Sequence, residues 1–317
     1  MPAVDRGDGA FATSGEPDAG NQHMSTVGVV GAGVMGTGVA EAVARVSRSV
    51  VLVDVSADAL ERARAAIHRN CRMGRLLGTD AADPQEVLDR IETTGSLEAL
   101  ADCDFVVENI IEDFALKAPV YAELDRICPS GTIFIANTSA IPITRLASLT
   151  TRPDRVIGVH FMNPVPQKPA VELIPGFHTS PETLAATTAL LAVMGKQAIQ
   201  VRDASGFVSN RVLMLMINEA AFLLHEGTAT AATVDEVFRS CFGHPMGPLE
   251  TADLIGLDTI LLSLEVLLEH YADPKFRPSP VLRELVNAGC TGRKAGRGFH
   301  HYSDVSSSST PRPLELT

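Results

Sequence analysis

Tryptophan is absent from the chain, and several features that would indicate other classes of protein are missing as well. The 317-residue sequence has no run of 18 or more uncharged apolar residues, so we expect no transmembrane helix. Its five cysteines are odd in number and widely spaced, with no CxxC pair, which argues against a disulfide scaffold and against a zinc site. We therefore expect reduced thiols, a cytoplasmic location and no metal.

Basic residues are in the minority, because 26 Lys and Arg stand against 38 Asp and Glu, for a formal net charge of −12. This balance argues against binding to nucleic acids or to anionic membranes. The 45% hydrophobic content is typical of a globular protein. The length suits two domains, each large enough to bury its own core.

Both ends of the chain are low in sequence complexity. Residues 1–24 lack apolar periodicity, and they have neither the basic nor the apolar segment of a secretory signal. Residues 303–317 contain a serine run followed by Pro-Arg-Pro. We predict that both segments are disordered.

Between these ends, the periodicity of the sequence changes once. Residues 25–203 alternate short β-branched runs with amphipathic stretches, which is the pattern of a parallel sheet with crossover helices. Residues 204–302 are helical in pattern, with long helices predicted over 210–226 and 248–271. Thr233 followed by Glu236 has capping-box spacing, which predicts a helix start there. The fold class is therefore α/β, with an all-helical second domain.

A glycine-rich turn follows the first predicted strand. Gly31, Gly33 and Gly36 have GxGxxG spacing in the run VGVVGAGVMGTGVA. The first glycine permits a tight turn, the second lets a pyrophosphate approach the backbone, and the third lets the helix pack close to the strand. At the start of that helix, Val34 and Met35 offer free N–H groups to phosphates.

A lone motif of this kind is common, but the second predicted strand supports the interpretation by ending in Asp54. A carboxylate about 20 residues beyond the glycines can accept both ribose hydroxyls and would repel a 2′-phosphate. No arginine follows in VSADAL. The pattern predicts a Rossmann-like domain that binds NAD rather than NADP.

A candidate chemical centre follows in the segment RVIGVHFMNPVPQKPAVELIPG. His160 ends one β-rich run, and Glu172 lies twelve residues later in a second. Ligands of a nucleotide-binding sheet lie beyond the carboxyl ends of its strands, which is where this histidine is expected. The loop can bring Glu172 against the far imidazole nitrogen, where it would fix the tautomer and stabilise the imidazolium. We interpret His160 as a general base for an alcohol whose hydride passes to nicotinamide; the alternative is a structural histidine beside a solvated glutamate.

Further motifs follow in a fixed order, and through them the sequence resembles the NAD-dependent L-3-hydroxyacyl-CoA dehydrogenase family, which includes the 3-hydroxybutyryl-CoA dehydrogenases. The likeness covers about residues 26–302. It is carried by GAGVMGTGVA, VVEN, NTSAIPIT, HFMNPVP with the later VEL, SGFVSNRV, GHPMGPLETADLIGLD and GRKAGRGF. The resemblance implies NAD as cofactor, a 3-hydroxyacyl thioester as substrate, and a helical domain that dimerises and closes over the substrate.

The resemblance also implies roles for individual residues. His160 would be the base and Glu172 its partner, while Ser139 and Asn210 would form hydrogen bonds around the reacting oxygen. The residues implied near the cofactor, besides the glycine-rich turn and Asp54, are Glu112, Lys117, Ser139, Asn163 and Lys294.

The helix expected after the second strand departs from the family pattern. Asn70 and Leu77 stand where the family has a serine and a lysine that meet CoA. Arg69, Arg72 and Arg75 lie three residues apart and share roughly one helix face. Such a face suits either CoA or an acidic acyl carrier protein. A glyceryl-type group on a carrier protein, oxidised toward a polyketide extender unit, therefore stays open as an alternative to a CoA thioester.

Two other classes share part of the pattern. β-Hydroxyacid dehydrogenases have a similar glycine-rich opening but use a lysine base, for which Lys196 is the candidate in the middle of the chain. That class has no place for the His160 and Glu172 pair. A non-enzymatic NAD-binding relative would be expected to have lost the pair.

Assembly is the last expectation. Residues 212–224 and 254–268 carry more apolar surface than one small helical bundle needs to bury. Together with the resemblance, this surface predicts a homodimer through the second domain.

Overall fold

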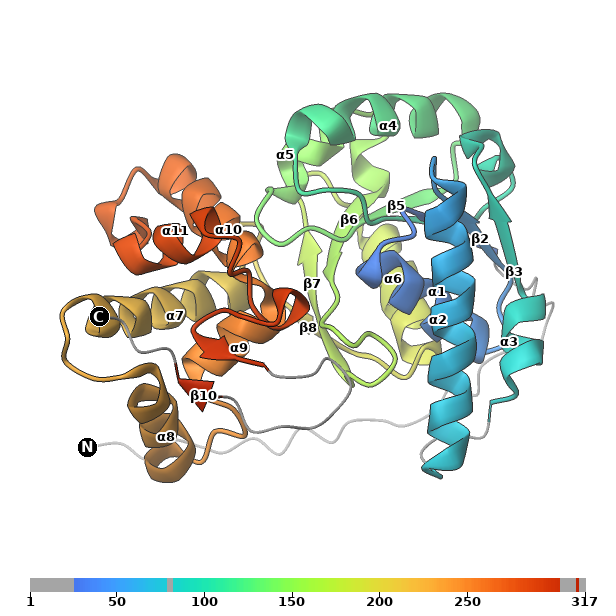
Figure 1. Cartoon of the computed structure of the whole chain (residues 1–317). Helices are drawn as coiled ribbons and strands as arrows, with labels where there is room; N and C mark the ends of the chain where they lie inside the picture. Colours follow the sequence, from blue (N-terminus) through green and yellow to red (C-terminus); the bar gives the residue numbers. More distant parts are fainter. Residues whose placement is uncertain (1–25, 79–81, 303–311, 314–317) are drawn as a thin grey trace, which may run out of the picture.

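The computed structural model describes residues 26–78, 82–302 and 312–313 (Figure 1). The segments predicted to be disordered, 1–24 and 303–317, lie outside the described residues apart from β10 (Arg312–Pro313). This short strand pairs antiparallel with β9 (His300–His301). Within the described ranges, no helix is long and apolar enough to cross a membrane.

The first domain is built on an eight-stranded sheet in the order β3-β2-β1-β4-β5-β6-β7-β8. The central strands consist of buried, mostly β-branched residues, as expected where helices cover both faces of a sheet. The strands are β1 (Val27–Val30), β2 (Val50–Val53), β3 (Ile91–Thr94), β4 (Phe105–Glu108), β5 (Ile133–Ala136), β6 (Val156–His160), β7 (Ala170–Pro175) and β8 (Gln197–Gln200).

The sheet differs from the expected one in two respects. Strand β7 runs antiparallel to β6, so the sheet is mixed rather than wholly parallel. Strand β3, with the sequence IETT, was not predicted from the sequence. It lies at the sheet edge, where its residues after Ile91 are partly or fully exposed and need no apolar run.

Helices cover the two faces of the sheet and enclose a separate core on each. Because successive side chains of a strand point to opposite faces, Val29 of β1 belongs to one core and Val30 to the other. The first face carries α1 (Val34–Arg45), α2 (Ala57–Leu76), α3 (Pro84–Asp89) and α6 (Pro181–Val193). The second face carries η1 (Leu97–Leu100), α4 (Phe114–Ile127) and α5 (Ile143–Ala147), with η2 (Pro153–Arg155) leading into β6.

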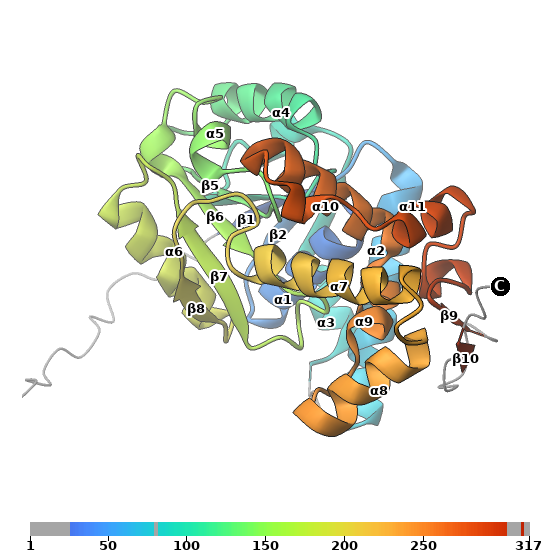
Figure 2. The same ribbon diagram turned by 90° about the vertical axis from the view of Figure 1, so that its left-hand side faces the viewer.

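The second domain packs its helices around a core of its own, beside the sheet domain (Figures 1 and 2). Figure 2 shows α7 crossing in front of this domain, with its start next to β7. The elements are α7 (Ser209–His225), α8 (Ala231–Phe242), α9 (Pro248–Ile255), α10 (Leu257–Tyr271), η3 (Pro274–Phe276), α11 (Pro280–Asn287) and η4 (Arg293–Ala295).

Two helix predictions in this domain are wrong. The stretch 248–271 forms two helices instead of one, because Gly256 has a φ of 109° that breaks the helical path. Helix α8 begins at Ala231 with Thr230 as its N-cap, whose hydroxyl accepts a hydrogen bond from the Thr233 backbone N–H. Glu236 does not close a capping box and pairs with Arg239 instead.

The strand order determines where a ligand can bind. Strand β1 lies between β2 and β4, and the order of the chain reverses at β1 and β4. In sheets of this kind, ligands bind beyond the carboxyl ends of the strands at such a reversal. The segments that follow β1, β4, β5 and β6 therefore meet at one edge of the sheet.

Candidate active site

The glycine-rich turn after β1 has the geometry that a dinucleotide requires. Gly31 has a φ of 96°, and a side chain at Gly36 would lie 1.8 Å from the Gly31 carbonyl oxygen. Gly33, in contrast, faces open space, with no atom within 4 Å of where a Cβ would be. It is the N-cap of α1 and provides no side-chain cap, so the first N–H groups of the helix, at Val34 and Met35, are available to a diphosphate.

Asp54 closes this turn at the end of β2. One carboxylate oxygen accepts the Ala32 N–H at 2.7 Å, and the other accepts the Ser56 N–H at 2.8 Å. The carboxylate is thus fixed next to the glycine-rich turn, and each oxygen keeps a lone pair for a further donor. The residues present fit the ribose and diphosphate of NAD.

His160 and Glu172 are cross-strand neighbours. They are paired in the antiparallel register of β6 and β7, so both side chains project from the same face of the sheet. The His160 Nδ1 lies 2.8 Å from Glu172 Oε2, and both residues are 7% exposed. A carboxylate only accepts, so Nδ1 carries the proton and Nε2 presents its lone pair.

Helix α7 supplies further donors to Glu172 from the second domain. The backbone N–H groups of Val208 and Ser209 both donate to Glu172 Oε1 at 3.0 Å. The Ser209 hydroxyl donates to Oε2 at 2.5 Å. Burial alone would raise the pKa of Glu172, but the hydrogen bonds from His160 and Ser209 outweigh it and hold the pKa at about 2. Glu172 is therefore ionised at neutral pH.

Ser139 and Asn210 lie next to this pair. The Ser139 hydroxyl, just after β5, is 3.1 Å from His160 Nε2. The Asn210 side-chain amide, in the first turn of α7, donates to the Ser139 carbonyl at 3.3 Å. The structure thus brings together the four residues that the sequence predicts for the chemical centre.

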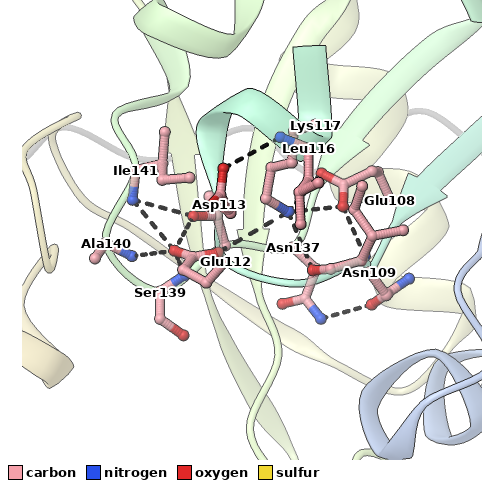
Figure 3. Close-up of polar contacts among 12 residues, drawn as sticks. Glu108, Asn109, Glu112, Asp113, Leu116, Lys117, Asn137, Ser139, Ala140 and Ile141 are labelled. Carbon is pink, nitrogen blue, oxygen red and sulfur yellow. Dashed lines mark hydrogen bonds and ion pairs between the residues drawn. The ribbon is translucent and has the colours of Figure 1, made fainter. Parts of the chain in front are cut away.

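Glu112 fixes the segment that carries Ser139 (Figure 3). Its Oε1 accepts the N–H groups of Ser139 and Ala140 at 2.9 and 2.8 Å, and a hydrogen bond from the Thr138 hydroxyl at 2.5 Å. A carboxylate that accepts several donors in this way orders the backbone that supplies them. Glu112 therefore acts on the site by shaping the turn after β5.

Comparison with known proteins places the chain in a family. Residues 26–204 match the NAD-binding domain of 3-hydroxyacyl-CoA dehydrogenase, and residues 206–302 match its C-terminal domain. The chain is 46% identical to a probable 3-hydroxybutyryl-CoA dehydrogenase of Bacillus subtilis over 289 residues, covering 90% of this chain and 100% of the relative. The crystal structure of (S)-3-hydroxybutyryl-CoA dehydrogenase from Ralstonia eutropha is 44% identical, with a TM-score of 0.82, covering 89% of this chain and 100% of that one. The chain belongs to the 3-hydroxyacyl-CoA dehydrogenase family.

Membership of this family confirms three expectations from the sequence. These are the resemblance itself, a Rossmann-like domain followed by a helical domain, and NAD as the cofactor. It also makes the chain an enzyme of the 3-hydroxyacyl-CoA dehydrogenase type.

Lys117, which the family resemblance puts near the cofactor, is completely buried in α4. Its ammonium group contacts both carboxylate oxygens of Glu108 at 2.6 and 2.8 Å and lies 3.9 Å from Glu112 (Figure 3). Burial raises the pKa of Glu108, and the lysine opposes this shift. With no exposed surface, Lys117 would act on a cofactor through Glu112 and not by contact.

The other two residues expected near the cofactor, Asn163 and Lys294, are both exposed. Asn163 is exposed in the loop that follows His160. Lys294, at the end of the second domain, forms an exposed ion pair with Asp258 of α10 at 2.6 Å. Its interaction therefore lies within the helical domain.

Helix α2 carries the residues expected to meet the substrate carrier. The side-chain amide of Asn70 donates to Glu41 of α1 at 2.8 Å, so this position ties two helices together. Arg75 pairs with Asp83 at 2.6 Å. Arg69 and Arg72 are exposed on the same helix.

Lys196, the base that a β-hydroxyacid dehydrogenase would require, has a structural environment. It is 7% exposed, and its ammonium group donates to the carbonyl oxygens of Val165 and Lys168 at 2.6 and 2.7 Å. These bonds hold the loop between β6 and β7. The group is saturated with acceptors, which excludes that alternative for this site.

Sequence reasoning missed two polar side chains at this site. Ser209 precedes Asn210 in the motif SGFVSNRV, and its hydroxyl bonds Glu172. Glu108 ends β4 as a charged residue in a run that is otherwise apolar, and it pairs with Lys117. A charge in a buried run was the available signal for Glu108, whereas nothing in the sequence brings Ser209 to β7.

Removal of the Asp54 carboxylate tests the cofactor site. We expect the wild-type protein to prefer NADH to NADPH, because a 2′-phosphate beside this carboxylate meets Coulomb repulsion. Asp54→Ala should weaken NADH binding by about tenfold, since charge-assisted hydrogen bonds to the ribose are lost. The same variant should reduce the ratio of kcat/KM for NADH to kcat/KM for NADPH. Asp58→Ala, which removes an exposed carboxylate four residues further on, is the matched control. Equal kcat/KM for NADH and NADPH in the unmutated protein would contradict the assignment.

Proposed function

We propose that the chain interconverts a short-chain (S)-3-hydroxyacyl thioester and its 3-oxoacyl form, with CoA as the first candidate for the thioester carrier. The observation that carries this proposal is the His160–Glu172 pair beside Ser139, at the same sheet edge as the glycine-rich turn. The relatives from Bacillus subtilis and Ralstonia eutropha are named for 3-hydroxybutyryl-CoA, which favours a short acyl chain.

His160 is the proton-transfer group in this proposal. In the oxidation direction, its Nε2 accepts the proton of the substrate hydroxyl as hydride leaves the same carbon. NAD, when bound, supplies the hydride acceptor. Glu172, ionised at neutral pH, holds the Nδ1 proton at 2.8 Å and stabilises the imidazolium that forms. In the reverse direction, the imidazolium returns the proton to the oxygen of the ketone.

Ser139 and Asn210 orient the reacting oxygen. The Ser139 hydroxyl lies 3.1 Å from His160 Nε2, so a substrate oxygen bound to the imidazole is also within reach of this donor. Asn210 bonds the Ser139 carbonyl and thereby holds the start of α7 against the turn after β5. Both domains must therefore be in place before the oxygen site is complete.

An acyl carrier protein is the second candidate for the thioester carrier, and α2 is the observation that favours it. Arg69 and Arg72 are exposed near Met73, Leu76 and Leu77, which are 55%, 71% and 68% exposed. Figure 1 shows this end of α2 projecting beyond the sheet. A mixed apolar and cationic helix end suits an acidic helical partner as well as the phosphates of CoA.

We further propose a homodimer formed through the helical domain and a cytoplasmic location. Large apolar side chains are exposed on four of its helices, among them Val212, Phe242, Leu254 and Leu262. Exposed apolar surface of this extent favours a self-complementary contact. The five cysteines are all free in the structure, which suits a reducing compartment.

The first test addresses the base. His160→Ala should lower kcat by about 100-fold or more, within the usual contribution of a general base. Glu172→Gln should lower kcat while leaving the dissociation constant of NADH nearly unchanged. The reason is that Glu172 contacts Nδ1 of the imidazole, whereas Nε2 is the atom proposed to face the reacting oxygen. Steady-state kinetics with acetoacetyl-CoA and NADH, together with NADH titration by fluorescence, provide both numbers. Near-normal turnover by His160→Ala would remove the mechanism.

The second test separates the two carriers. The double variant Arg69→Glu with Arg72→Glu should raise KM for an acetoacetyl carrier protein many-fold and leave an acetoacetyl-pantetheine thioester unaffected, if the carrier protein is the partner. Added salt should then imitate the mutation. The double variant Lys275→Glu with Arg283→Glu, which has the same charge change on the other domain, is the control. Wild-type kcat/KM for acetoacetyl-CoA in the range of about 10⁴–10⁸ M⁻¹s⁻¹ would instead favour CoA.

The third test addresses assembly. We expect light scattering at micromolar concentration to give a mass twice that of the chain. Leu254→Glu should shift the mass toward the monomer, because burying a carboxylate in an apolar contact is costly. Phe177→Glu, at an exposed apolar position of the sheet domain, should leave the mass unchanged. A monomer for the unmutated protein would contradict the proposal.

A further inference from the structure

One oxygen of Glu172 serves two donors. Oε2 accepts the Nδ1 proton of His160 at 2.8 Å and the Ser209 hydroxyl proton at 2.5 Å. The Ser209 oxygen is itself 3.3 Å from His160 Nδ1, so the three groups form a closed triangle. The other oxygen, Oε1, is occupied by two backbone N–H groups from the start of α7.

The Ser209 hydroxyl weakens the interaction between the Glu172 carboxylate and the His160 imidazole. A hydroxyl that donates to a carboxylate oxygen withdraws negative charge from it, and less charge remains for a competing donor at the same oxygen. The stabilisation that Glu172 can give to an imidazolium at His160 is therefore smaller. The contact from Nδ1 to the serine oxygen has the opposite effect, but at 3.3 Å it is the longer and weaker of the two.

We propose that Ser209 is a positioning residue that limits how strongly Glu172 holds the imidazolium form of His160, so that His160 can act as both base and acid near neutral pH. This inference rests on the proposed role of His160. An imidazole held too strongly by an unshared carboxylate would remain protonated and would fail as a base in the oxidation direction.

Few other charges bear on the imidazole among the residues that the structure describes. Glu172 faces it from β7 and Ser209 from α7, while the Phe207 ring packs against it with centroids 5.9 Å apart. The Ser139 hydroxyl faces Nε2 at 3.1 Å from the segment after β5, and the backbone N–H of Ser139 donates to Glu112. Ser209 is therefore the side chain through which the charge of Glu172 can be adjusted with the pair intact.

The test is the pKa of His160 in Ser209→Ala. Without the hydroxyl, Oε2 accepts a hydrogen bond from His160 alone, so we expect the titration of this imidazole to move to higher pH than in the wild-type protein. NMR titration of the imidazole C–H resonance, assigned by its loss in His160→Ala, measures the value without turnover. The acidic limb of kcat/KM for oxidation of 3-hydroxybutyryl-CoA should move to higher pH by the same amount. Reduction of acetoacetyl-CoA, which needs the imidazolium, should extend to higher pH.

Three variants serve as controls. Ser209→Thr keeps the hydroxyl and should retain the wild-type profile. Ser205→Ala removes a fully buried hydroxyl at the same domain junction, one that bonds the Ala140 carbonyl at 2.7 Å, and should not move the profile. Ser209→Gly repeats the test if the alanine variant does not fold.

An unchanged pKa in Ser209→Ala, or an equal rise in Ser205→Ala, would overturn the inference. A uniform loss of kcat, with no movement of either limb and no change in the NMR titration of His160, would assign Ser209 a merely structural role and would also overturn the inference. If the NMR pKa rises while the activity limbs stay in place, the inference about Ser209 holds and the assignment of His160 as the base fails. The two outcomes are therefore distinguishable.

Discussion

The carboxylate of Glu172 is the group on which both the chemical centre and the domain junction depend. It accepts His160 from the sheet domain, and it accepts two backbone N–H groups and one hydroxyl from the start of α7. A buried carboxylate is tolerated only when donors replace the water that it has lost. The carboxylate that pairs with the imidazole is therefore also stabilised by donors from the second domain.

Other carboxylates of the sheet domain work in the same way. Glu112 orders the turn after β5, and Asp203 accepts the N–H groups of Ile143 and Thr144 at the start of α5 at 2.8 Å each. In both cases, an anion from one segment satisfies the free N–H groups of another. These irregular segments are therefore held by charge-assisted hydrogen bonds, whereas the helices and strands are held by apolar packing in the three cores.

The parts of this architecture that follow local rules could be predicted from the sequence. The GxGxxG turn, Asp54 after β2, and the approach of Glu172 to His160 follow from spacing, because two strands joined by a loop bring such positions opposite each other. The break at Gly256 could not be predicted, because apolar periodicity continues through it. The edge strand β3 could not be predicted either, because it lacks apolar periodicity. The contact of Asn70 with Glu41 depends on how α1 and α2 pack, which no local pattern records. Likewise, the roles of the site residues in turnover stay predictions.

Lys196 has a consequence for how this enzyme can vary. Its ammonium group lies in the segment just before β8. It donates hydrogen bonds to carbonyl oxygens of the loop that joins β6, which carries His160, to β7, which carries Glu172. The bonds go to the backbone, so they do not depend on which side chains the loop carries. Substitutions of side chains in this loop can therefore leave these bonds, and the pairing of the two strands, in place. One lysine thus makes the conformation of the loop independent of the side chains that the loop carries.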